Sequence, residues 1–161
     1  MTRTMNLRNL ISLMTVITLM TGCGERERAA STGHHHESPH GGTAVELGDH
    51  EAHLDVVLDA ASGKLTAYVM DAHAENFVRI PAESFEIVAK LPGGETTLAL
   101  KAVANTASGE KVGDTSQFEA LSEALKGVAG FDAELKQVVV RGRTYSKVPF
   151  HVGKAGADKK L

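Results

Sequence analysis

The stretch HLDVVLDAASGKLTAYVM, residues 53–70, gives the clearest indication of the fold of this chain. In its first half apolar residues alternate with polar ones, so that Leu54, Val56 and Leu58 share one face. A period of two is typical of a half-buried strand. The segment 60–63, Ala-Ala-Ser-Gly, predicts a turn in which the glycine can adopt a positive φ, and the alternation then resumes. The stretch therefore predicts an antiparallel hairpin.

Two further pairs of segments have the same pattern. Segments 85–91 and 98–102 alternate on either side of a Pro-Gly-Gly turn, and segments 135–140 and 145–152 flank an Arg-Gly-Arg turn. With 43–47 as a first strand, the sequence predicts about seven strands.

One segment between the second and third pairs indicates a helix instead. In residues 117–127, Phe118, Leu121 and Leu125 recur at helical spacing, and Gly127 is a suitable C-terminal stop. We therefore predict an all-β domain over residues 41–153, specifically an immunoglobulin-like antiparallel β-sandwich of about seven strands with one short helix.

The N-terminal segment, residues 1–22, has the layout of an export signal. Arg3 and Arg8 precede an apolar run over 10–20 that contains no charge and is too short to cross a bilayer as a helix. The residues Leu-Met-Thr-Gly-Cys that end at Cys23 resemble the lipobox of bacterial lipoproteins, in which the cysteine is lipidated and becomes the mature N-terminus. The resemblance implies a lipoprotein signal peptide, lipidation of Cys23 and anchoring in the cell envelope facing the periplasm.

Residues 23–40 then form a predicted flexible tether rich in histidine, and residues 154–161 a polar C-terminal tail. The tether lacks apolar periodicity and is dominated by charged and small residues. Gly24, rather than aspartate, favours the outer membrane by analogy with enteric lipoproteins. Removal of the signal changes the formal net charge from −3 to −5, and the basic residues are scattered, which argues against a nucleic-acid partner. Cys23 is the single cysteine, so no intramolecular disulfide can form.

The start of the domain resembles a known family. The stretch HGGTAVELGDHEAHLD, residues 40–55, is similar to the opening of the small β-domain at the N-terminus of periplasmic adaptor subunits of heavy-metal efflux pumps. The similarity continues through GKLTAYVMD at 63–71, Pro81, Phe85 and the Pro-Gly-Gly turn at 92–94. It also extends to free-standing lipoproteins of environmental bacteria. Because the other domains of an adaptor have no counterpart here, the resemblance implies an accessory role beside an efflux protein.

Histidines are the candidate ligands of the chain. Neutral imidazole binds Zn, Cu(II), Ni and Co, and carboxylates can complete the coordination shell. Joint ligation by two of the candidates, in the segment Asp-His-Glu-Ala-His, requires a bend before the strand, because an extended chain would point them to opposite faces. We predict an open, exchangeable site that is not required for folding and draws on seven histidines: His34, His35, His36, His40, His50, His53 and His73. The alternative interpretation is that the tract of three solvates the tether and that the others are surface residues; His151 is expected to be a polar residue near a strand end.

The function predicted from the sequence is that of a membrane-anchored lipoprotein that binds or buffers divalent transition metals, accessory to heavy-metal efflux. The alternative is a non-catalytic interaction module that docks another envelope protein through its strands. No nucleophile motif, glycine-rich phosphate loop or recognisable carboxylate pair is present in the sequence, so we do not expect an enzyme.

Overall fold

The computed structural model describes residues 38–153, and this part of the chain is all-β, as predicted. Seven of its strands lie where the sequence predicts them, and an eighth occupies the predicted helix. The elements are β1 (Thr43–Leu47), β2 (Ala52–Asp59), β3 (Lys64–Met70), β4 (Ser84–Leu91), β5 (Gly94–Ala102), β6 (Gln117–Leu121), the short 3-10 helix η2 (Glu123–Leu125), β7 (Gly130–Val140) and β8 (Arg143–Gly153).

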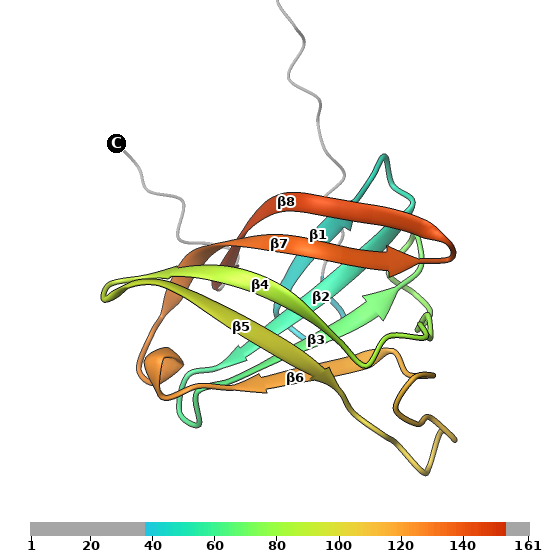
Figure 1. Ribbon diagram of the computed structural model, residues 1–161, viewed down its shortest axis with the longest axis horizontal. Helices are drawn as coiled ribbons and strands as arrows, with labels where there is room; N and C mark the ends of the chain where they lie inside the picture. Colours follow the sequence, from blue (N-terminus) through green and yellow to red (C-terminus); the bar gives the residue numbers. More distant parts are fainter. Residues whose placement is uncertain (1–37, 154–161) are drawn as a thin grey trace, which may run out of the picture. The chain divides into compact units, whose positions relative to one another are not determined.

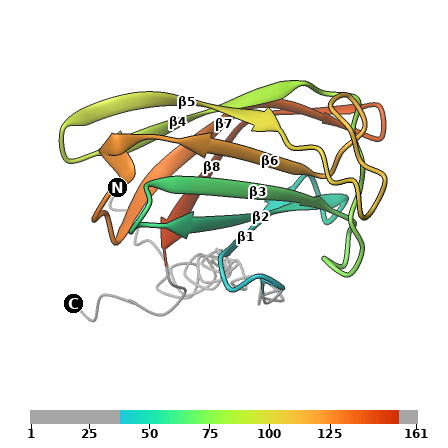
Figure 2. The same cartoon turned by 90° about the horizontal axis from the view of Figure 1, so that it is seen from below.

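The strands form one antiparallel sheet in the order β1-β2-β3-β6-β5-β4-β7-β8. Figure 1 shows this sheet curling round on itself, and Figure 2 shows β5, β6, β3, β2 and β1 following one another across one side. The architecture is thus barrel-like, and the prediction of a two-sheet sandwich is corrected. The physical reason is that strands of different hairpins pair with one another. β6 pairs with both β3 and β5, and β7 pairs with both β4 and β8, so all eight strands belong to one sheet.

The two outermost strands, β1 and β8, meet and nearly close the sheet. The hydroxyl of Thr43 donates a hydrogen bond to the carbonyl oxygen of Gly153 at 3.2 Å and accepts one from the backbone N–H of the same residue at 3.4 Å. Closure of this kind protects strand edges that would otherwise pair with other chains.

The β2–β3 hairpin forms as the alternation predicts, with ladder pairs from His53↔Met70 to Asp59↔Lys64. At the turn, the Asp59 carboxylate accepts hydrogen bonds from the Ser62 hydroxyl and from backbone N–H groups, and these bonds lower the pKa of Asp59. Gly63 has φ 73°, and a Cβ there would lie 2.4 Å from the carbonyl oxygen of Ser122. Both the backbone conformation and the close approach require glycine at this position.

β6 replaces the helix that the spacing of Phe118, Leu121 and Leu125 predicts. In the structure Phe118 and Ala120 point into the core, whereas Leu121 is 74 % exposed. The segment pairs with β3 along five residues, so tertiary pairing outweighs a helical pattern that is short. Only η2, which contains the buried Leu125, remains of the helix.

A single hydrophobic core fills the inside of the sheet, and all eight strands contribute to it. The outer face of β2 is buried in part as well: His53 is 2 % exposed and Asp55 is 1 % exposed. Buried polar side chains need hydrogen-bond partners, so neighbouring segments must cover these two residues on the outside of the sheet. Within residues 38–153, no helix has the length and apolar character needed to span a membrane.

Candidate metal centre

The outer face of β2 is organised by the registers of its two neighbours. Glu46 of β1 lies opposite His53 on one side, and Met70 of β3 lies opposite it on the other. Directly opposed residues on one face of an antiparallel pair have Cβ atoms about 4.5–5.5 Å apart. The ladder therefore brings the Glu46 carboxylate beside the His53 imidazole.

The turn between β1 and β2 adds a second imidazole to the same face. Gly48 has φ 70° and His50 has φ 53°, so the chain reverses in left-handed conformations before β2 begins. The backbone N–H of His50 donates to Oε1 of Glu46 at 3.0 Å, and its Nδ1 lies 3.4 Å from the same oxygen. This turn supplies the bend that joint ligation by His50 and His53 requires.

Glu46, His50 and His53 offer three ligand atoms that all lie within 4.8 Å of one another. Ligands bound to one tetrahedral Zn²⁺ at about 2.0–2.1 Å are roughly 3.3 Å apart. The side chains of His50 and Glu46 are 47 % and 42 % exposed, so they have room for the modest rotations that would bring the three atoms to bonding distance. Two imidazoles and a carboxylate suit Zn, Cu(II), Ni or Co and leave coordination positions for water.

His53 is the buried member of the group, and a backbone carbonyl orients it. Its Nδ1 lies 3.2 Å from the carbonyl oxygen of Asp71. Because a carbonyl oxygen can only accept, Nδ1 carries the proton in the neutral ring, and Nε2 is the atom with the lone pair.

His40, predicted as a ligand, lies outside this group. Its Nδ1 is 2.7 Å from Oδ2 of Asp55, its backbone N–H donates to the same oxygen at 3.0 Å, and its ring stacks on Tyr68 with centroids 4.1 Å apart. The Ser38 hydroxyl donates to the other carboxylate oxygen of Asp55. The Ser-Pro-His-Gly-Gly segment thus covers Asp55 and fastens the start of the described chain to β2.

The remaining predicted ligands are separated from the group or cannot be placed. His73 lies in the loop after β3, where its backbone N–H donates to Asp71 at 3.3 Å. His151, expected near a strand end, lies on β8, and its Nδ1 is 2.8 Å from Asp132. Three further candidates and the predicted lipidation site lie outside the described residues: His34, His35, His36 and Cys23.

Glu46 is the member of this group that the sequence-based prediction missed. The sequence contains the information needed to find it, because pairing the predicted strands 43–47 and 53–59 through a tight turn places Glu46 opposite His53. The prediction considered histidines along the chain but not carboxylates across the ladder.

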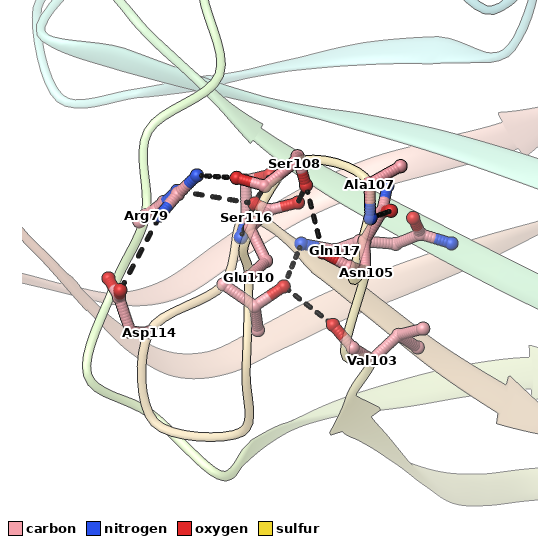
Figure 3. A network of polar contacts seen from close by, with 10 residues as sticks. Arg79, Val103, Asn105, Ala107, Ser108, Glu110, Asp114, Ser116 and Gln117 are labelled. Carbon is pink, nitrogen blue, oxygen red and sulfur yellow. Dashed lines mark hydrogen bonds and ion pairs between the residues drawn. The ribbon is translucent and has the colours of Figure 1, made fainter.

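A second polar cluster surrounds Glu110 in the connection from β5 to β6 (Figure 3). One carboxylate oxygen accepts from the Ser116 backbone at 2.9 Å and hydroxyl at 2.6 Å, and the other accepts from the Ser108 hydroxyl at 2.7 Å. Burial raises the pKa of Glu110, but these hydrogen bonds and nearby Arg79 outweigh it and leave the pKa lowered. Protein donors engage both oxygens, so we interpret this cluster as a structural clamp.

Comparisons with protein-family models, with curated proteins and with solved structures find no match for this chain. The resemblance to efflux-pump adaptor domains therefore stays a prediction. The fold and the site define the class: an all-β domain that carries a candidate transition-metal centre at the edge of a nearly closed sheet.

Proposed function

We propose that this protein binds a divalent transition metal ion through Glu46, His50 and His53. The observation that carries the proposal is the convergence of these three side chains within 4.8 Å on the outer face of β1 and β2. Imidazole nitrogens with one carboxylate are ligands of borderline metals, which points to Zn, Cu(II), Ni or Co.

The proposed site is exchangeable rather than structural. The hydrophobic core lies on the opposite face of the sheet and draws on all eight strands without the three ligands. Ordering two exposed side chains around an ion costs conformational entropy, on the order of 1–2 kcal/mol for a long side chain such as Glu46. We therefore expect micromolar or weaker binding, which suits buffering or transfer of metal.

The proposed location is the cell envelope, with the protein held at the membrane by lipidated Cys23 and facing the periplasm. The apolar run over 10–20 and the lipobox-like residues before Cys23 support this location. The histidine tract 34–36 would then add weaker metal ligands between the anchor and the domain. Such a protein would act as an accessory to a heavy-metal efflux system.

Calorimetric titration of Zn, Cu(II), Ni and Co into the chain beginning at Gly24 tests the proposal. We expect His50→Ala and Glu46→Gln each to weaken binding at least ten-fold, because each removes one of three ligands. His151→Ala is the matched control, an exposed histidine on β8 outside the group, and should leave the affinity unchanged. Replacing the histidines of the tract 34–36 with serine should remove only additional weak binding.

Two results would contradict the proposal. If His50→Ala and Glu46→Gln leave the metal affinity unchanged, the metal does not bind at the proposed site on β1 and β2. If replacing the histidines of the tract 34–36 alone abolishes binding, the metal binds to the tether and not to the domain.

Docking of an envelope protein is the second candidate, and one region of the sheet favours it. β5 and β6 pair only at Lys101↔Glu119 and Ala102↔Phe118, and beyond these pairs the strands border a cleft of about 580 Å³. Leu121, 74 % exposed, lines this cleft. Unpaired strand edges accept an added strand from a partner. If the titration shows no metal binding, docking of an envelope protein becomes the favoured function.

A further inference from the structure

The loop after β3 is in direct contact with the buried member of the proposed metal centre. The carbonyl oxygen of Asp71 lies 3.2 Å from Nδ1 of His53 and also accepts the backbone N–H of Ala74 at 3.1 Å. β3 is the neighbour of β2, and Met70, the residue before Asp71, is the ladder partner of His53. The loop therefore reaches the imidazole from the adjacent strand, on the opposite side from Glu46.

The carboxylate of Asp71 fixes the position of its own carbonyl. It accepts hydrogen bonds from Nδ2 of Asn76 at 2.7 Å and from the backbone N–H groups of Glu75 and His73 at 3.0 and 3.3 Å. The backbone N–H of Asp71 also donates to the carbonyl oxygen of Asn76 at 2.9 Å. These bonds, led by that from Asn76, lower the pKa of Asp71 to about 2, so the carboxylate is ionised at neutral pH.

A fixed carbonyl at this point determines both the tautomer and the orientation of His53. The ring donates from Nδ1 to Asp71, which makes Nε2 the coordinating atom and holds the ring plane against the loop. His50 and Glu46 are half exposed and can adjust, whereas His53 is 2 % exposed and cannot. The direction of the buried ligand therefore sets where an ion can sit.

We propose that Asp71 is a positioning residue of the metal centre, acting through its backbone carbonyl on His53. This inference rests on the proposed function, because it concerns the same three ligands. Outer partners of metal-bound histidines orient the ring and raise its basicity, and their loss costs about 10–100-fold in metal affinity.

The chain offers a matched control at the other end of β2. Asp59 also follows a run of strand residues and accepts the Ser62 hydroxyl and the backbone N–H of Ala61 at 2.6 and 3.0 Å. Its loss would loosen a turn of the same kind, 59–63, without touching His53. Asp71→Ala and Asp59→Ala therefore remove similar hydrogen bonds and differ in their relation to the proposed site.

The experiment measures metal affinity and the His53 tautomer in the chain beginning at Gly24. Calorimetric titration with Zn should show affinity about ten-fold weaker in Asp71→Ala and unchanged in Asp59→Ala. Without metal, long-range ¹H–¹⁵N spectra should show His53 protonated at Nδ1 in the wild type and as a tautomer mixture in Asp71→Ala. The His53 signal is identified by its loss in His53→Gln, and Asn76→Ala gives a milder variant if Asp71→Ala folds poorly.

The outcomes separate this inference from the function on which it rests. Wild-type affinity and tautomer in both Asp71→Ala and Asn76→Ala would overturn the positioning role and leave the metal centre in place. Equal losses of affinity in Asp71→Ala and Asp59→Ala would also overturn it, because the effect would then be general loosening. No metal binding by the wild type would remove the proposed function and the positioning role together.

Discussion

At the scale of single residues, Asp55 accounts for two members of the Ser-Pro-His-Gly-Gly segment, Ser38 and His40. The side chain of Asp55 is 1 % exposed, and Ser38 and His40 supply its hydrogen bonds. A buried carboxylate is costly unless it is fully hydrogen-bonded, so covering Asp55 stabilises the outer face of β2. His40, which the sequence suggests as a metal ligand, is engaged in this structural contact.

The two glycines of this segment should differ in their tolerance of a side chain. A Cβ at Gly42 would lie 2.2 Å from the carbonyl oxygen of Val56, whereas Gly41, with φ 73°, has open space around it. We expect Gly41→Ala to cost about 1 kcal/mol for its left-handed conformation. Gly42→Ala should cost more, on the order of 2–3 kcal/mol, since backbone atoms must shift. Urea unfolding of both variants checks the order, and equal losses would contradict the tight approach.

At the scale of elements, β6 shows how a local pattern can indicate the wrong structure. The residues at 118, 121 and 125 fit a helical stripe, but 118 and 120 also fit the period of a strand. β3 would have an unpaired edge without β6, and pairing with it buries Phe118 against Phe85, with ring centroids 4.9 Å apart. The long-range ladder decides between two local patterns that the sequence supports almost equally.

Two substitutions distinguish the strand from the helix. We expect Phe118→Ala to lower the free energy of unfolding by about 3–5 kcal/mol, because it empties a fully buried position. Leu121→Ala should change it by less than about 0.5 kcal/mol, because Leu121 is largely exposed. A helix packed through both residues would lose several kcal/mol in each case. Equilibrium denaturation of the two variants gives the answer.

At the scale of the whole domain, closure of the sheet depends on contacts between the first and last strands. Thr43 and Gly153 are separated by nearly the full described chain, yet the threonine hydroxyl bridges both polar backbone atoms of the glycine. β1 itself is also held by its ladder with β2 over five residues, and this hairpin contains all three proposed ligands. Closure therefore bears on the stability of the domain, whereas the proposed metal centre is built within one hairpin.

Removing the Thr43 hydroxyl should measurably lower the free energy of unfolding. We expect Thr43→Val to lower the free energy of unfolding by about 1–2 kcal/mol, since two hydrogen bonds of roughly 0.5–1.5 kcal/mol are lost. Thr97→Val, at an exposed position of β5, is the matched control and should have an effect within about 0.5 kcal/mol. Equal effects of the two substitutions would show that the hydroxyl of Thr43 does not hold the sheet closed.

The all-β class, seven of the eight strands and the glycine turns between them could be predicted from the sequence alone. These features follow from alternation and turn chemistry, which act between near neighbours. The approach of Glu46 to His53 also follows from the register of one short hairpin, although the prediction did not use it. Two features follow instead from tertiary pairing: the hairpins share one nearly closed sheet, and residues 117–121 form a strand. Those outcomes depend on which strands pair and in which register, and such contacts join residues far apart in the chain that no local pattern specifies.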